Sequence, residues 1–186
     1  SVTFDKRCEQ DPGHVGVKSP QFSFQRLLGA DPILGVEMSS TGEVACFGEN
    51  VEEAFLKSLK ASNVPIPEKG STICICINDD SDFDVIKRLY SMGYHFIAAN
   101  HKSNKLLEKN NIMSSGLEGN ECYGIKNKEI DLVLDMSQNN KENYHIRRNA
   151  IDYNVPLITN DEQIKLLTRS LEKNVKLLPK SYDEYF

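Results

Sequence analysis

The chain has 186 residues and a formal net charge of −5 at neutral pH. This length suits one domain with an appendage and is too short for a complete ATP-dependent synthetase, and the acidic balance is the opposite of the basic surface typical of nucleic-acid-binding proteins. The sequence holds no apolar run long enough to cross a membrane, and its first residues lack the apolar stretch of a signal peptide. We therefore expect neither a nucleic acid nor a membrane as a partner.

Proline and glycine divide the sequence into two predicted units. The stretch VPIPEKG breaks any helix, so we place a hinge at residues 62–70. We expect a first unit at residues 18–61, preceded by a disordered or linker segment at residues 1–17. A second domain should occupy residues 71–186.

Residues 50–60 predict a helix that closes the first unit. Asn50 and Glu53 have the spacing of a capping box at its start. Its apolar stripe consists of Val51, Ala54, Phe55 and Leu59. If left uncovered, such a stripe would favour self-association.

The second unit alternates apolar runs with amphipathic helical patterns. Runs without polar alternation predict strands that are covered on both faces, at residues 71–77, 94–99, 130–134 and 155–158. Helical patterns follow them at residues 81–90, 103–107, 143–153 and 160–171, with Ser81, Ser103 and Asn160 as expected caps. Residues 113–129 show no clear pattern. This order predicts an α/β fold of Rossmann type, an open parallel sheet flanked by helices in three layers.

The five cysteines do not have the spacing of a zinc site. Cys74 and Cys76 lie on one face of a predicted strand, too far apart for an unstrained disulfide. We expect them to be buried thiols rather than a redox pair.

Ligands of open parallel sheets bind beyond the carboxyl ends of the strands. Polar loops follow Ile77, Ala99, Asp135 and Ile158 at this edge. Such loops also serve as plain helix caps, and that alternative stays open.

Two segments carry a family resemblance. The sequence EMSSTGE (residues 37–43), within residues 19–49, resembles the end of the second ATP-grasp unit of carbamoyl-phosphate synthetases. The sequence NYHIRR (residues 143–148) resembles a motif of their ammonia-using, urea-cycle branch. The resemblance covers residues 18–173. It implies an ATP-grasp remnant in the first unit and a methylglyoxal-synthase-like regulatory domain in the second.

The resemblance implies an allosteric role at the C-terminal end of a much larger enzyme. The expected partners are a small anionic effector, either N-acetyl-L-glutamate or a nucleotide, and the catalytic domains of the same polypeptide. It implies no catalytic residue, metal or cofactor in this chain, whereas the whole enzyme would use ATP and magnesium to make carbamoyl phosphate from ammonia and bicarbonate. The implied location is the mitochondrial matrix, with the cytoplasm as the alternative.

The expected effector site draws on the strand-end loops and on one helix. Its residues are Asn100, Lys102, Ser103, Asp135, Gln138, Asn139, Asn143, Tyr144, Arg147 and Thr159. Ala99 and Lys102 stand where the family has two threonines, and Lys102 can attract an anion as a point charge. Arg147 can grip a ligand carboxylate with two hydrogen bonds, or it can bridge to Asp131, Asp135 or Glu142.

Two alternatives remain open at this point. The chain could be a stand-alone binding module, derived from the synthetase, that has lost its effector and acts through protein contacts. It could also be a methylglyoxal-synthase-like lyase with Asp135 as general base, although no glycine-rich phosphate cradle follows that residue.

Overall fold

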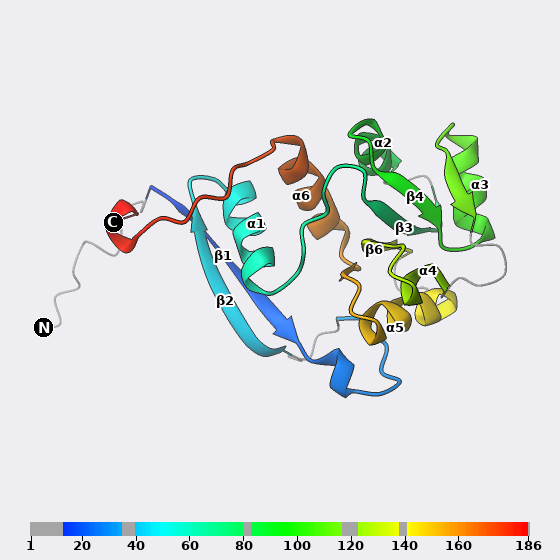
Figure 1. Ribbon diagram of the computed structural model, residues 1–186, viewed down its shortest axis with the longest axis horizontal. Helices are drawn as coiled ribbons and strands as arrows, with labels where there is room; N and C mark the ends of the chain where they lie inside the picture. Colours follow the sequence, from blue (N-terminus) through cyan, green and yellow to red (C-terminus); the bar gives the residue numbers. More distant parts are fainter. Residues whose placement is uncertain (1–12, 35–39, 80–82, 117–122, 138–140, 186) are drawn as a thin grey trace, which may run out of the picture.

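The structure is a computed structural model that describes residues 13–34, 40–79, 83–116, 123–137 and 141–185 (Figure 1). These residues form a two-stranded antiparallel sheet and a five-stranded parallel sheet. The strands are β1 (Val15–Phe22), β2 (Ser40–Gly48), β3 (Thr72–Ile77), β4 (His95–Ala98), β5 (Ser114–Gly116), β6 (Leu132–Met136) and β7 (Leu157–Ile158). The α-helices are α1 (Val51–Ala61), α2 (Phe83–Ser91), α3 (His101–Lys109), α4 (Tyr123–Lys126), α5 (Tyr144–Asp152) and α6 (Asp161–Glu172). Short 3-10 turns are η2 (Phe24–Arg26), η3 (Lys141–Asn143) and η4 (Tyr182–Glu184).

The parallel sheet has the strand order β5-β4-β3-β6-β7. Alternate side chains of its central strand, β3, enter two different cores. Ile73 and Ile75 pack into a cluster with apolar residues of α1, α2 and α6, whereas Cys74 and Cys76 pack with residues of α4 and α5. Figure 1 shows α2 and α6 on one side of the sheet and α4 and α5 on the other. The predicted three-layer α/β fold is therefore confirmed, and the two cysteines are buried free thiols as expected.

The first unit consists of the β1–β2 ribbon and α1. Figure 1 shows α1 between this ribbon and α6. Phe55, Leu56 and Leu59 of α1 are at most 9% exposed and belong to the same core cluster as the residues of β3. The apolar stripe of α1 is thus covered within this chain, by α6 and its neighbours.

The start of α1 is fixed by its cap and by a glycine. The Asn50 side chain accepts the backbone N–H of Glu53 at 3.0 Å, as the capping-box spacing predicts. The Glu53 carboxylate accepts the N–H of Glu49, at 2.8 Å, rather than that of the cap residue. A Cβ at Gly48 would lie 2.5 Å from the backbone nitrogen of Ala54, so only glycine fits where β2 turns into α1.

The structure differs from several of the predicted elements. β1 begins at Val15, inside the predicted linker, because Val15 and Val17 pair with β2. The strand expected at residues 130–134 is β6, two residues further along. Residues 113–129, without a predicted element, contain β5 and α4. Residues 62–70 form turns and chain without regular secondary structure, and the division into two domains stays a prediction.

The helix cap predicted at Ser103 is wrong. Asn100 caps α3, and its side chain accepts the backbone N–H of Ser103 at 2.8 Å. The last helix starts as predicted, because the Asn160 side chain accepts the N–H of Gln163 at 3.0 Å. The predicted cap Ser81 lies outside the described residues.

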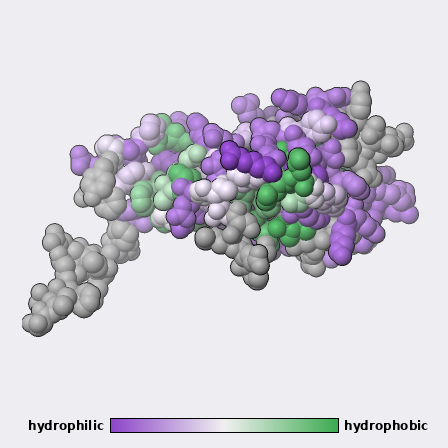
Figure 2. Space-filling view, turned by 90° about the horizontal axis from the view of Figure 1, so that it is seen from below, coloured by the Kyte–Doolittle hydropathy of each residue, from purple (hydrophilic) through white to green (hydrophobic). Residues whose placement is uncertain are grey.

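Figure 2 shows one face of the molecule, seen from below, which is mainly polar with some apolar surface toward the middle. Leu27 and Leu28, in the segment after β1, are 55% and 91% exposed. Among the helices that the structure describes, none is long and apolar enough to cross a membrane.

Candidate functional site

The carboxyl ends of β3, β4 and β6 bring polar side chains together, as expected for an open parallel sheet. Asn100 follows β4, Asp135 lies near the end of β6, and Asn143 and Arg147 come from η3 and α5. These four predicted site residues belong to one network of hydrogen bonds. Asp135, Asn143 and Arg147 are each at most 1% exposed, so the network is buried.

The network begins at the cap of α3. The Asn100 side-chain amide donates to Asn143 Oδ1 at 2.9 Å, and the Asn143 amide donates to Ser137 Oγ at 2.8 Å. The Ser137 hydroxyl in turn donates to Asp135 Oδ1, which also accepts the backbone N–H of Ser137 at 3.0 Å. The Asn78 side chain donates to the carbonyl of Ser137 at 2.8 Å and fastens the end of β3 to this loop. Buried polar groups are costly without partners, so this closure stabilises the strand ends.

Arg147 lies between two carboxylates. Its Nη1 donates to Asp135 Oδ2 at 2.7 Å. Its Nε and Nη2 donate to the two oxygens of Asp31, at 2.7 and 2.6 Å. Burial by itself lowers the pKa of Arg147, but the hydrogen bonds that Arg147 donates to Asp31 and Asp135 outweigh it and raise that pKa well above its ordinary value. Arg147 is therefore a permanent cation, held by one carboxylate from the sheet and one from the first unit.

Asp31 belongs to a segment that we call the arm (residues 23–31), which runs from the end of β1 across α5. Nη1 of Arg148 donates to three carbonyls of the arm, those of Phe24, Leu27 and Ala30, at 3.1 to 3.2 Å. The Tyr144 hydroxyl donates to the carbonyl of Gly29 at 2.8 Å. Gly29 has a φ of +73°, a conformation that favours glycine.

Arg148 is oriented for this contact by its own helix. Its Nε donates to Asp152 Oδ1 at 3.0 Å, one helical turn further along α5. The hydrogen bond to Asp152 raises the pKa of Arg148 and lowers that of Asp152. The side chain of Gln25 adds a hydrogen bond from the arm to the carbonyl of Ile151 at 3.2 Å. The helix α5 thus presents one face to the arm, with Tyr144, Arg147 and Arg148 all in contact with it.

The remaining predicted site residues that the structure describes are not among the four residues of this network. Ser103 is fully buried, and its hydroxyl bonds to the backbone of Ile77, so its role is to join α3 to β3. Lys102 is exposed in the first turn of α3, and Thr159 is half-buried after β7. Gln138 and Asn139 lie outside the described residues.

Sequence reasoning missed Asp31 and Ser137 as members of the network. Ser137 stands two residues after Asp135 in a polar loop at a strand end. That position could have identified it as a site residue. Asp31 lies 116 residues before Arg147, and no spacing rule connects the two. Of the alternatives for Arg147, the bridge to Asp135 is present, whereas Asp131 accepts the N–H of Thr72 at 2.8 Å.

The network offers a ligand a buried cation and several amide and hydroxyl groups. Both oxygens of Asp135 accept hydrogen bonds, one from Ser137 and one from Arg147, so the network holds this carboxylate in a fixed position. Within the described ranges, no group of three or more His, Cys, Asp or Glu residues is placed to hold a metal ion. A guanidinium with a bidentate carboxylate partner is instead a typical anion-binding arrangement.

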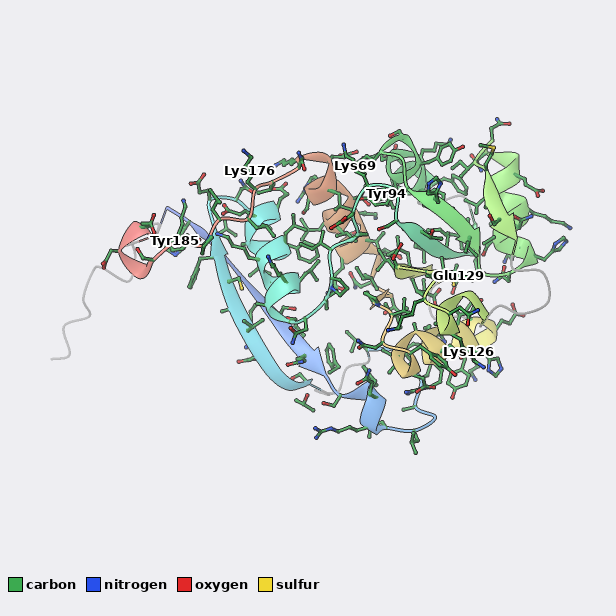
Figure 3. All side chains as sticks on the ribbon, in the orientation of Figure 1. Lys69, Tyr94, Lys126, Glu129, Lys176 and Tyr185 are labelled. Atoms are coloured by element: carbon green, nitrogen blue, oxygen red, sulfur yellow. The ribbon has the colours of Figure 1, made fainter. Side chains whose placement is uncertain are left out.

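A second feature lies away from the strand ends, where the C-terminal segment crosses the first unit. Figure 3 labels Tyr185 in this segment, beside the β1–β2 ribbon. Its hydroxyl donates to the carbonyl of Phe47 at 2.9 Å and accepts from Lys57 Nζ at 2.8 Å. Lys57 also pairs with Glu53 at 2.7 Å. A shallow groove of about 490 Å³ runs between α1 and this segment, and these contacts hold one side of it.

Comparison of the sequence with those of known proteins identifies the family of this chain. The human mitochondrial carbamoyl-phosphate synthase [ammonia] is 37% identical over 188 residues, which cover 92% of this chain. The multifunctional protein URA2 of Saccharomyces cerevisiae is 37% identical over 186 residues, which cover 88% of this chain. The mitochondrial carbamoyl-phosphate synthase [ammonia] of Aquarana catesbeiana is 34% identical, over 92% of this chain.

All three relatives are much longer proteins. The aligned region is 12% of the human and frog enzymes and 8% of the yeast protein, so this chain matches a small part of each. No family model matches the chain. The identities hold across nearly the whole chain, including both units. The chain therefore belongs to the carbamoyl-phosphate synthase family, as a homologue of one segment of those longer proteins.

Proposed function

We propose that this chain is the regulatory, effector-binding region of an ammonia-dependent carbamoyl-phosphate synthase. The ligand would be a small carboxylate, with N-acetyl-L-glutamate as the first candidate, bound at the carboxyl ends of β3, β4 and β6. The making of carbamoyl phosphate from ammonia, bicarbonate and ATP would belong to the catalytic domains of a longer polypeptide. The names of two aligned relatives place them in mitochondria, and we propose the mitochondrial matrix for this protein.

The single observation that carries the proposal is the environment of Arg147. This arginine is buried at the edge of the sheet where ligands of open α/β folds bind, and it already grips a carboxylate through Nε and Nη2. Its third nitrogen, Nη1, donates to Asp135, which fixes the plane of the guanidinium. A guanidinium held in one plane can donate two parallel hydrogen bonds to a carboxylate, which the ammonium group of a flexible lysine cannot do.

The same geometry supports a route from the site to the first unit. The helix α5 carries Arg147 and also contacts the arm through Tyr144 and Arg148. At the start of the arm, the hydroxyls of Ser23 and Thr41 of β2 lie 2.9 Å apart and share a hydrogen bond, within the predicted ATP-grasp remnant. A change at Arg147 would thereby reach the first unit through a contiguous set of hydrogen bonds. Couplings of this kind are typically about 1 to 3 kcal/mol.

A second candidate function is a binding module that has lost its small effector and acts through protein contacts. The observation that favours it is the closure of the network, in which Asn100, Asn143 and Arg147 all have partners from this chain. Exposed Leu27 and Leu28 on the arm would then belong to a protein interface.

Isothermal titration calorimetry with N-acetyl-L-glutamate tests the first proposal. The chain is compared with Arg147→Lys, which keeps the charge but cannot form two parallel hydrogen bonds to one carboxylate. The matched control is Arg88→Lys, because Arg88 also makes a bidentate pair, with Glu172, but between α2 and α6.

We expect saturable binding to the chain and to Arg88→Lys. Binding to Arg147→Lys should be at least about tenfold weaker, with circular dichroism showing that all three proteins are folded. Binding that is equal in all three proteins would place the ligand elsewhere. No binding to any of them up to millimolar ligand would contradict N-acetyl-L-glutamate as the effector and favour the second candidate.

A further inference from the structure

Asp31 covers an edge of the Arg147 guanidinium on which a ligand carboxylate can accept two parallel hydrogen bonds. Nε and Nη2 form this edge, and both donate to Asp31. The remaining nitrogen, Nη1, donates to Asp135. The Arg147 side chain has no exposed surface, whereas that of Asp31 is 30% exposed. Asp31 therefore stands between the guanidinium edge and solvent.

A ligand carboxylate and Asp31 would exclude each other at this edge. A bidentate pair uses both parallel N–H groups of the edge at once. Asp135 is 1% exposed and belongs to the central sheet, so it is the less movable of the two carboxylates. A third carboxylate beside one guanidinium would leave the cluster with excess negative charge. The carboxylate that can leave is Asp31.

The connection of Asp31 to the rest of the chain makes it a strong competitor. It is tethered to α5 by the arm, whose carbonyls of Leu27, Gly29 and Ala30 accept from Arg148 and Tyr144. A tethered group acts at an effective concentration that reaches the millimolar range. None of these tethering hydrogen bonds uses the Nε–Nη2 edge, so the arm can stay attached while Asp31 moves.

We infer that Asp31 is an internal competitor for the effector site: it occupies the carboxylate-binding edge of Arg147, and an effector carboxylate binds there by displacing it. This inference rests on the proposed effector role of the site and describes how that site is regulated. It has two consequences. The affinity for the effector depends on a residue of the first unit, and binding of the effector releases the end of the arm from Arg147.

Calorimetric titration of Asp31→Ala and Asp31→Asn tests the inference. The matched control is Glu172→Gln, which removes the carboxylate from the other bidentate arginine pair of the described chain, at the opposite end of α6 from the strand-end loops. Two probes are used, N-acetyl-L-glutamate and the simple dicarboxylate glutarate. If Asp31 occupies the edge in about nine molecules of ten, its removal raises the apparent affinity about tenfold.

We expect Asp31→Ala to bind each probe at least about tenfold more tightly than the unchanged chain, with Glu172→Gln like the unchanged chain. Asp31→Asn should lie between them, because a neutral amide oxygen is a weaker competitor for the guanidinium. If Asp31→Ala does not fold, the comparison of Asp31→Asn with the unchanged chain tests the inference.

The outcomes separate the inference from the proposed function. Equal affinities in all the proteins would overturn the inference and leave an effector site in place. Glutarate binding that appears only without the Asp31 carboxylate, with no binding of N-acetyl-L-glutamate, would support the inference and contradict that effector. No binding of either probe to the folded Asp31 variants would overturn both.

Discussion

Asp31 binds Arg147 through both carboxylate oxygens, although the two residues are 116 positions apart in the sequence. The contact joins the first unit of the chain to the strand-end network of the second. A change at either residue therefore affects both units, and the predictions below separate this contact from the ordinary requirements of folding.

Removal of the Asp135 carboxylate should lower the free energy of unfolding far more than removal of a carboxylate near the surface. Asp135→Ala takes away the buried partner of Arg147 and the acceptor of Ser137, and we expect a loss of about 3 kcal/mol in the free energy of unfolding. Glu172→Gln, at a half-buried pair, should cost between 0 and about 1 kcal/mol. Urea denaturation measures both. Equal losses of unfolding free energy in the two variants would contradict a stabilising role for the buried network.

Arg148 should control the order of the arm. Arg148→Met removes the donor for three arm carbonyls, so the backbone amides of Leu27 and Ala30 should exchange with deuterium faster. Amides of α6, such as that of Ile164, should exchange at an unchanged rate. Arg169→Met is the control, because its partner is Glu52 on α1 and not the arm. Unchanged exchange in the arm would show that Arg148 does not hold it.

The first unit should fold together with the sheet. Leu59 is 9% exposed in the shared core, and Leu59→Ala should cost about 2 to 5 kcal/mol. Lys60→Ala, at the neighbouring exposed position, should change stability by no more than about 0.5 kcal/mol. Fluorescence and circular dichroism should report a single urea transition in each protein. Two separate transitions would mean that α1 folds independently of the sheet.

Glu53 should give a pH-dependent contribution to stability. Burial by itself raises its pKa, but hydrogen bonds from Lys57 and from the Glu49 backbone outweigh burial and lower the pKa below the ordinary value of 4.5. A carboxyl whose pKa is lower in the folded state stabilises the fold fully above its unfolded pKa, and this contribution disappears as the pH falls through the folded pKa. Glu53→Gln should therefore be less stable than the unchanged chain at pH 7.

The difference in unfolding free energy between Glu53→Gln and the unchanged chain should shrink as the pH falls below 4.5. Glu162→Gln is the control, because Glu162 pairs with Lys165 at an exposed position and should show little difference at either pH. A difference for Glu53→Gln that stays constant down to low pH would contradict the lowered pKa.

The sequence was sufficient to predict most of the sheet and less of its edges. β3 is an unbroken apolar run because both of its faces are covered, and such runs are visible without a structure. β5 has the sequence SSG at the edge of the sheet, where it pairs only with β4, and nothing apolar marks it. The cap of α3 was misassigned because Asn100 and Ser103 are both good cap residues, and the spacing alone does not choose between them.

The candidate site was predictable only in part. The strand-end rule pointed to Asn100 and Asp135, since it depends only on the order of strands and helices, whereas Arg147 was suggested by the family resemblance of residues 143–148. Asp31 was assigned to the other unit, and its pairing with Arg147 depends on how the arm folds over α5. Long-range pairs of this kind leave no periodic pattern in one sequence.

Hydrogen–deuterium exchange of the arm, with and without saturating N-acetyl-L-glutamate, tests most directly whether the strand-end site regulates the first unit. If the effector displaces Asp31 from Arg147, the amide of Ala30, next to Asp31, should exchange faster in its presence, while that of Ile164 in α6 should not. Calorimetric binding of the effector without any change in the exchange of the arm would contradict the account.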